Sequence, residues 1–174
     1  MEIEKKFLVK FIPKETKEVH IKVIEQGYLS VNPVVRIRRS NDRYILTYKS
    51  HKGIDVNDFE DICVSNEVEL PLTKESYEHL REKTDGMIIS KTRYNIPLAI
   101  YSPEYGKLKA ELDVFHGDLE GLTFVEVEFE SVSQAQEFKP PVWFGKDVSD
   151  EARYRNSFLS SIKDRKQFLE IFQE

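Results

Sequence analysis

The sequence of 174 residues has a single cysteine and no long apolar run. That cysteine, Cys63, cannot form a disulfide within the chain. No segment approaches the roughly 18 apolar residues that a membrane-spanning helix needs, and the N-terminus lacks the basic and then apolar pattern of a signal peptide. We therefore expect a cytoplasmic protein with no membrane partner, in which Cys63 packs within a strand.

A large charge of one sign is also missing, because 31 acidic residues stand against 26 basic ones and leave a net charge of −5. The chain therefore offers no strong signal for nucleic-acid binding, and any affinity for phosphate must come from local clusters. The hydrophobic content of 40% and the aromatic content of 11% exclude a disordered chain.

Short runs rich in β-branched and aromatic residues alternate with turn residues, which predicts a mainly β protein of the α+β class with about eight strands. The expected strands are Glu2–Val9, Ile21–Val31, Val34–Arg39, Tyr44–Lys49, Phe59–Leu70, Met87–Ile100, Leu108–Phe115 and Leu122–Phe129.

Helical signals are fewer. Thr73 is expected to cap a helix that reaches Lys83, and a helical region is expected from Ser149 or Asp150 onward. No repeat or linker divides the chain, so we expect one domain over residues 1–174, with residues 160–174 as a C-terminal helical extension.

Charged residues recur at alternate positions of seven expected strands, while the residues between them are mainly apolar or aromatic. Residues i and i+2 of a strand share a face. The sets are Glu2, Glu4 and Lys6; Arg36 and Arg38; Thr47 and Lys49; Glu67 and Glu69; Lys91 and Arg93; Glu111 and Asp113; and Glu126 and Glu128. Six of the sets carry charges of only one sign, which is unusual for a solvated surface and indicates a site.

Two arrangements explain this alternation. An open sheet with its charged face in water accounts for any single pair. An eight-stranded antiparallel barrel with a charged lumen and outer helices accounts for the sorting by sign. Buried charges cost several kcal/mol each unless they are paired. Such a lumen therefore needs a divalent cation for its acids and an anion for its bases, and a metal-bound polyphosphate supplies both.

The segment Glu2-Ile3-Glu4-Lys5-Lys6 resembles the Glu-x-Glu-x-Lys signature of the CYTH, or triphosphate tunnel metalloenzyme, superfamily. The other charged sets follow in the order expected of that family, over roughly residues 1 to 160. The resemblance implies an eight-stranded antiparallel tunnel. It also implies action on a triphosphate, such as inorganic triphosphate, thiamine triphosphate or, in class IV adenylyl cyclases, ATP.

The resemblance also implies a site with Mg²⁺ or Mn²⁺ as cofactor and a small-molecule triphosphate as substrate. The implied substrate-binding residues are Lys6, Arg36, Arg38, Lys49, Lys91, Arg93 and Arg153. The implied metal ligands are Glu2, Glu4, Asp113, Glu126 and Glu128. The acids that either complete a second metal site or orient bases are Glu67, Glu69 and Glu111.

Lys6 and Tyr28 are the candidate catalytic residues, because inorganic triphosphatases of the family pair a tyrosine at this position with the signature lysine. A half-buried strand aromatic explains Tyr28 equally well, and a surface arginine at a helix end explains Arg153 equally well. The four histidines lack metal-ligand spacing and are assigned to no site. Trp143 is expected to pack a loop against the barrel.

Three functions remain open at the level of the sequence. We favour a metal-dependent triphosphatase that converts inorganic triphosphate to pyrophosphate and phosphate. The alternatives are a class IV adenylyl cyclase and a non-catalytic module that binds polyphosphate or a nucleotide. No sequence feature indicates an adenine pocket, and the complete set of acids weakens the third hypothesis. A homodimer is compatible with the sequence.

Overall fold

The computed structural model describes residues 2–51 and 63–172. The strands are β1 (Glu2–Val9), β2 (His20–Val31), β3 (Val34–Ser40), β4 (Arg43–Ser50), β5 (Cys63–Leu72), β6 (Asp85–Pro97), β7 (Lys109–Phe115), β8 (Thr123–Glu128) and β9 (Phe144–Asp147). The α-helices are α1 (Lys74–Arg81), α2 (Val132–Glu137), α3 (Asn156–Leu159) and α4 (Arg165–Phe172). Short 3-10 helices span Lys14–Lys17, Leu98–Ile100, Pro103–Tyr105, Gly117–Leu119 and Ala152–Tyr154.

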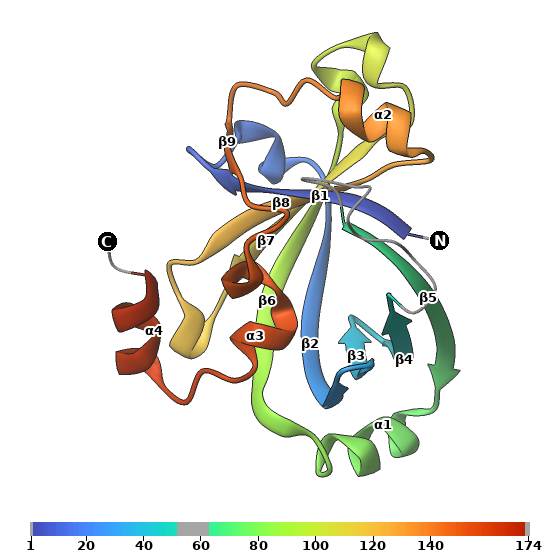
Figure 1. The fold of residues 1–174 in the computed structure, drawn as a ribbon, viewed down its shortest axis with the longest axis vertical. Helices are drawn as coiled ribbons and strands as arrows, with labels where there is room; N and C mark the ends of the chain where they lie inside the picture. The colour runs from blue at the N-terminus through green and yellow to red at the C-terminus, as the bar shows by residue number, and fades with distance from the viewer. Residues whose placement is uncertain (1, 52–62, 173–174) are drawn as a thin grey trace.

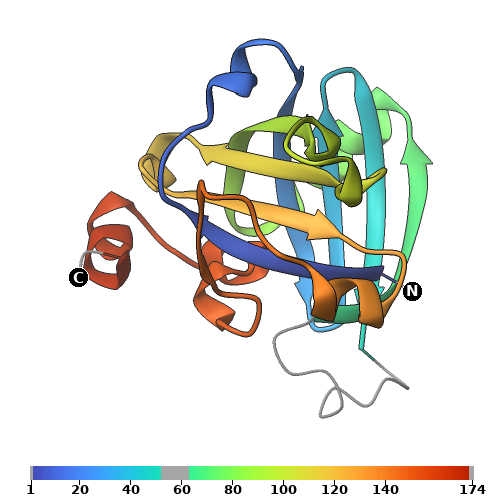
Figure 2. The same ribbon diagram turned by 90° about the horizontal axis from the view of Figure 1, so that it is seen from above.

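The strands form one sheet that closes on itself (Figures 1 and 2). Its order is β5-β4-β3-β2-β6-β7-β8-β1-β9, and an additional antiparallel pairing between β1 and β5 closes the first eight strands into a barrel. Strand β9 adds to the outside of this ring by pairing with β1. The predicted eight-stranded antiparallel barrel with outer helices is confirmed.

The closure between β1 and β5 is short, because only Glu2–Glu4 pair with Cys63–Ser65. Among the described residues, the rest of β5 pairs with β4 alone. On the outer face of this part of β5, Val68 is 54% exposed and Leu70 is 55% exposed. Pro71 lies in the same stretch, which fits an edge position because proline has no N–H to donate to a neighbouring strand.

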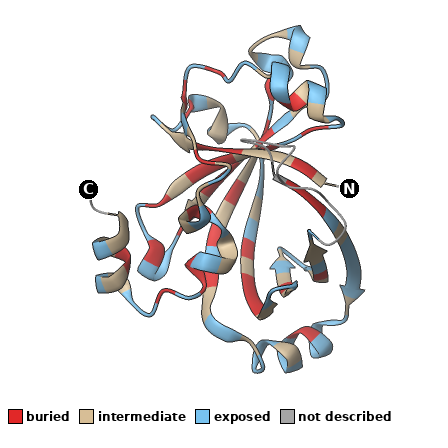
Figure 3. Ribbon diagram, viewed as in Figure 1, coloured by how far each residue is buried: buried red, intermediate tan, exposed pale blue. Residues whose placement is uncertain are grey.

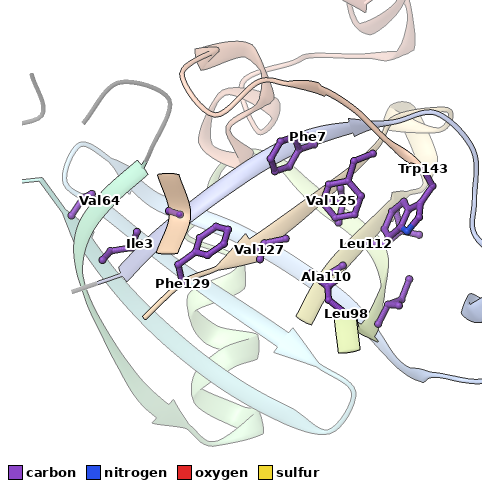
Figure 4. Close-up of a cluster of buried hydrophobic side chains, with 13 residues drawn as sticks. Ile3, Phe7, Val64, Leu98, Ala110, Leu112, Val125, Val127, Phe129 and Trp143 are labelled. Atoms are coloured by element: carbon purple, nitrogen blue, oxygen red, sulfur yellow. The ribbon is translucent and has the colours of Figure 1, made fainter. Parts of the chain in front are cut away.

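A hydrophobic core lies on the outer face of β1, β7 and β8 (Figure 4). Residues of β9 and α2 cover it, and Trp143, immediately before β9, is 1% exposed. The expected packing of Trp143 against the barrel is therefore confirmed. Gly145 allows β9 to approach closely, since a Cβ there would lie 3.0 Å from the Leu8 carbonyl oxygen.

A second apolar cluster closes one end of the barrel. It joins Phe115 and Phe124, which share strand faces with the inward-facing acids, to Tyr154, Leu159 and other residues of the C-terminal segment. Helices α3 and α4 lie on this side of the barrel (Figure 1). The buried residues concentrate in β1, β2, β6, β7 and β8 (Figure 3), whereas β3 and β4 have one buried residue each.

Most elements follow the sequence-based expectations. Thr73 caps α1, with its hydroxyl accepting a hydrogen bond from the Ser76 amide, as predicted. Seven of the expected strands match β1 to β4 and β6 to β8 to within a few residues, and the eighth matches β5 only from Cys63, since residues 59–62 lie outside the described part. Within the part of the chain that the structure describes, no helix has the length and apolar character needed to cross a membrane.

Two expectations near the C-terminus differ from the structure. Strand β9 was not predicted, because four residues that follow two prolines carry little periodic signal. The helical region begins with the 3-10 helix Ala152–Tyr154, followed by α3 from Asn156, rather than at Ser149 or Asp150. The physical reason is that Ser149 is bound to the barrel, where its hydroxyl accepts a hydrogen bond from the Lys6 amide at 2.9 Å.

Candidate active site

The barrel encloses a cavity of about 1570 Å³ to which every barrel strand contributes side chains. Of the residues expected at the site, those that line it are Glu2, Glu4, Lys6, Tyr28, Arg36, Arg38, Lys49, Glu67, Glu69, Lys91, Arg93, Glu111, Glu126 and Glu128. The strand alternation therefore places fourteen predicted residues around one lumen, and Asp113 and Arg153 lie outside its lining.

The wall formed by β6, β7 and β8 is a closed network of ion pairs. Asp113, whose side chain is fully buried, accepts hydrogen bonds from Lys91 Nζ at 2.6 Å and from Arg93 Nε at 2.7 Å. Arg93 Nη2 also bonds the second Asp113 oxygen at 2.7 Å and Glu126 at 2.8 Å, and its Nη1 bonds Glu111. Both oxygens of Asp113 are thus occupied by cations, which is not the environment of a carboxylate free to bind metal.

The protonation of this wall follows from the same contacts. Burial lowers the pKa of Lys91 to about 8, although the Asp113 carboxylate opposes the shift. Burial also works to raise the pKa values of Asp113 and Glu126, but neighbouring cations outweigh it and hold both below their ordinary values. These groups therefore stay charged near neutral pH.

The signature lysine, Lys6, is held by the C-terminal segment as well as by an acid. Its Nζ donates to the Tyr154 carbonyl oxygen at 2.9 Å, lies 3.0 Å from Glu126 Oε1 and sits 4.4 Å from the centroid of the Phe124 ring. Ser149 fixes the backbone of Lys6 through the bond described above. The ammonium group therefore has a fixed position at the inner end of the lumen.

Tyr28 is buried against the same end of the barrel. Its hydroxyl accepts a hydrogen bond from Gln26 Nε2 at 3.5 Å. Burial raises the pKa of Tyr28, and the charge of Arg36 works in the opposite direction. Among the described residues no hydrogen bond joins Tyr28 to Lys6, so their pairing stays a prediction.

The wall formed by β3, β4 and β5 is less tightly bonded. Lys49 Nζ lies 2.5 Å from Glu2, 3.6 Å from Glu4 and 3.7 Å from Glu67. Arg38 meets Glu69 at 2.7 Å, whereas the nearest carboxylate oxygen to Arg36, on Glu67, is 4.0 Å away.

Carboxylates crowd together where β1 meets β5 and β8. Glu4 lies opposite Glu128 in the β1–β8 register. Burial and the charges of other glutamates raise the pKa values of Glu4 and Glu128, and burial together with Glu2 raises the pKa of Glu67 to about 7. Burial also opposes ionisation of Glu2, but the Lys49 ammonium outweighs it and lowers the pKa. This end of the lumen thus has an excess of negative charge that a cation would relieve.

Within residues 2–51 and 63–172, no three histidine, cysteine or acidic side chains are arranged to hold an ion as they stand. The reason is that several of the glutamates are bonded to lysine and arginine side chains instead. Metal binding would therefore require some of them to exchange an amino-acid partner for the ion.

The C-terminal segment contributes residues that the sequence analysis did not assign. The Arg153 guanidinium stacks 5.0 Å from the Tyr154 ring and pairs with Glu151 at 3.2 Å, outside the lumen. Arg155 and Asn156 line the cavity instead, and Asn156 Oδ1 accepts a 3.4 Å hydrogen bond from Lys91. No periodic pattern in this irregular segment distinguishes Arg155 from Arg153.

Further polar residues also line the cavity, among them Gln26, His20 and His51. Gln26 and His20 share a strand face with Tyr28, so the alternation that identified Tyr28 also indicates them. Their lack of charge kept them out of the sorted sets.

The succession of charged strands around this lumen is matched by a known family. The CYTH domain family matches residues 1–139. This chain belongs to the CYTH family. The CYTH chain is 38% identical over 162 residues to an inorganic triphosphatase from Nitrosomonas europaea, which covers 91% of this chain and 96% of the relative. It is 32% identical over 161 residues to an inorganic triphosphatase from Acetivibrio thermocellus, with coverage of 91% and 92%.

The CYTH barrel is also similar to a solved structure. A crystal structure of an inorganic triphosphatase superposes with a TM-score of 0.64 at 36% identity, covering 92% of this chain and 95% of that one. The similarity therefore extends beyond residue 139 to the C-terminal segment that closes the barrel.

Proposed function

We propose that this CYTH protein is a divalent-metal-dependent triphosphatase that hydrolyses inorganic triphosphate to pyrophosphate and phosphate. The observation that carries the proposal is the single lumen in which the six bases of the sorted strand sets and a cluster of acids face one another. The inorganic triphosphatase at 38% identity, which matches 91% of this chain, supports the same substrate.

The acids of the lumen fit a hard divalent cation. Glu2, Glu4 and Glu128 supply carboxylate oxygens, which Mg²⁺ and Mn²⁺ prefer, and the raised pKa values of Glu4 and Glu128 reflect a repulsion that a cation would remove. We propose these three as the principal ligands, with Glu126 beside them. Bound metal would neutralise charge on the phosphate oxygens and on the attacking water.

The bases of the lumen would bind and orient the phosphate chain. Arg36 and Arg38 offer forked donors suited to phosphate oxygens, and Lys49 and Lys6 offer compact charges. Lys91 and Arg93, held in place by Asp113, would present a rigid cationic wall. We propose that Asp113 positions these two bases rather than binding metal. Most of the catalysis then comes from positioning and charge stabilisation.

Glu67 is our candidate for the residue that receives the proton. With a pKa of about 7 it is suited to proton transfer near neutral pH. In the proposed step a water molecule gives a proton to the Glu67 carboxylate. The oxygen of that water forms a bond to the terminal phosphorus. The bond from that phosphorus to the bridging oxygen breaks, and pyrophosphate leaves with the electron pair.

The test is an assay of phosphate release and cyclic AMP formation from inorganic triphosphate, thiamine triphosphate and ATP, each with Mg²⁺ and with Mn²⁺. We expect the highest kcat/KM for phosphate release from inorganic triphosphate and no activity in a chelator. Cyclic AMP with little phosphate release would instead establish a cyclase. Binding without any product would establish a non-catalytic module.

Adjacent lysines offer a matched pair of variants. Lys6→Ala should lower kcat/KM by about 10²-fold or more, the usual loss when one charge-stabilising donor is removed. Lys5→Ala should stay close to wild type, because Lys5 lies on the opposite strand face and pairs with Asp147 at 3.1 Å. Circular dichroism checks that both variants fold. Equal activities would refute the inward placement of Lys6.

We also propose that residues 1–174 form a single domain in which residues 160–174 are a helical extension. The contacts of α4 with the apolar cluster at the barrel end support this. The cytoplasmic location and the homodimer stay predictions.

A further inference from the structure

Buried polar atoms without a hydrogen-bond partner gather on one wall of the lumen. Five such side-chain atoms occur in the described part of the molecule. Four belong to β3, β4 and β5, namely Arg36 Nε, Arg38 Nε, Thr47 Oγ1 and Glu67 Oε2, and the fifth is Trp143 Nε1 in the outer core. This wall therefore has hydrogen-bonding capacity that the protein itself leaves unused, in contrast to the saturated wall around Asp113.

Thr47 is the uncharged member of this group. Its side chain is fully buried, and it shares a strand face with Ile45 and Lys49, which both line the cavity. A buried hydroxyl without a partner costs about 1–3 kcal/mol relative to an apolar group of the same shape. Valine would fill the space without that cost. A hydroxyl kept in this position therefore needs an explanation.

The strand register supplies a partner for it. Thr47 lies directly opposite Arg36 on β3 and opposite Glu69 on β5. Thr47 Oγ1 and Arg36 Nε are thus unpartnered atoms on directly paired residues. After a side-chain rotation, Thr47 Oγ1 can accept a hydrogen bond from the Arg36 Nε–H.

Arg36 is also the base held least closely by a carboxylate. Its nearest carboxylate oxygen is 4.0 Å away, whereas Lys6, Arg38, Lys49, Lys91 and Arg93 each have one within 3.0 Å. The Tyr28 hydroxyl, on the directly paired residue of β2, also interacts with the Arg36 side chain. Among the described residues no carboxylate holds the guanidinium closely, so its terminal nitrogens can turn to a phosphate, provided that something fixes their orientation.

We propose that Thr47 is a positioning residue for Arg36. In the ligand-bound lumen the Arg36 Nε–H donates to Thr47 Oγ1, and this bond directs the two terminal nitrogens of Arg36 at phosphate oxygens. The inference rests on the proposed function for the identity of the ligand. Thr47, an uncharged residue, would thus contribute to substrate affinity, a role that the pattern of charged residues does not indicate.

Thr47→Val and Thr47→Ser test the proposal, with Thr123→Val as the matched control. Thr123 lies on barrel strand β8 and is not part of the cavity lining. Thr47→Val should raise KM for inorganic triphosphate about tenfold, the value of one hydrogen bond to a charged group, with little change in kcat. Thr47→Ser should restore KM, and Thr123→Val should leave it unchanged.

Thermal unfolding of the ligand-free variants gives a second readout. Thr47→Val should unfold at the same temperature as the wild type or higher, because it removes an unpartnered buried hydroxyl. A lower unfolding temperature with unchanged KM would overturn the proposal, since the hydroxyl would then have a purely structural partner.

Calorimetric titration with pyrophosphate and Mg²⁺ separates this inference from the proposed function, because it requires no turnover. Weaker pyrophosphate binding in Thr47→Val than in Thr47→Ser supports the role of Thr47, even if the wild type fails to hydrolyse inorganic triphosphate. Equal binding by the two variants overturns it, even if the triphosphatase activity is established.

Discussion

At the scale of single residues, the inward-facing acids of the barrel divide into those that hold cations and those that repel one another. Asp113 belongs to the first kind, because Lys91 and Arg93 occupy both of its oxygens. Glu128 belongs to the second, because it is exposed to the cavity and its pKa is raised by burial and by Glu2, Glu111 and Glu4. The two carboxylates should therefore respond differently to removal of their charge.

We expect Asp113→Asn to lower the free energy of unfolding by about 3–5 kcal/mol, because it leaves buried cations without their counterion. Urea denaturation measures this loss. The Mg²⁺ concentration for half-maximal activity should stay the same in whatever activity remains. A stable Asp113→Asn protein with weakened metal activation would show instead that Asp113 binds the metal.

Glu128→Gln should behave in the opposite way. Its unfolding free energy should match or exceed that of the wild type, since one repelling charge is removed, while half-maximal activation should need about 10-fold more Mg²⁺. A metal titration of the activity checks this expectation. An unchanged titration would remove Glu128 from the set of ligands.

The difference between these acids could not be predicted from the sequence. Alternation placed both residues on the inner faces of their strands, but only Glu128 lines the cavity, whereas Asp113 is buried behind Lys91 and Arg93. The pairing of Asp113 with Lys91 and Arg93, however, depends on the β6–β7 register and on depth in the barrel. Neither quantity is encoded in the spacing of residues within one strand.

Among the elements, α1 shows how local signals and tertiary contacts agree. Thr73 caps its first turn, and the buried Tyr77 packs 5.2 Å from the Tyr44 ring on the outer face of β4. Tyr77 and Arg81 both bond Glu25 of β2. The helix therefore covers the side of the barrel facing away from the lumen.

Thr73→Ala should lower the free energy of unfolding by about 1 kcal/mol through loss of the cap, and it should leave kcat and KM unchanged. Thr73→Ser keeps the capping oxygen and should retain the wild-type stability. Urea denaturation of both variants provides the comparison. A change in kcat/KM would indicate that α1 is coupled to the lumen.

The C-terminal segment shows the limit of such local signals. Thr73 and the apolar spacing after it predict α1, whereas β9, the Ser149 contact and the cavity lining at Arg155 come from irregular chain that packs only because the barrel is already there. Tertiary contacts decide the structure of this segment, and propensity has little influence on it.

At the scale of the whole molecule, the lumen makes stability depend on pH. Glu67 keeps its proton up to a pH of about 7 in the folded protein, compared with an ordinary value of 4.5. Between these values the folded state binds more protons than the unfolded chain. The free energy of unfolding therefore falls as the pH rises through this window.

The Glu67→Gln variant lacks the pH-dependent contribution of Glu67 to the free energy of unfolding. We expect the unfolding temperature of the metal-free wild type to fall between pH 5 and pH 7 relative to that of Glu67→Gln measured in the same buffers. Parallel curves for the two proteins over this range would show that Glu67 titrates normally.

Strand β5 has one further consequence, for the behaviour of the protein at high concentration. Beyond Ser65 its backbone pairs on one side only among the described residues, and its outward Val68 and Leu70 are exposed. Such an edge can template the addition of a strand from another molecule and so begin aggregation. Pro71 interrupts the row of amide donors in this stretch. A single imino acid thus discourages fibril-like growth from an edge that, among the described residues, has a paired neighbour on one side only.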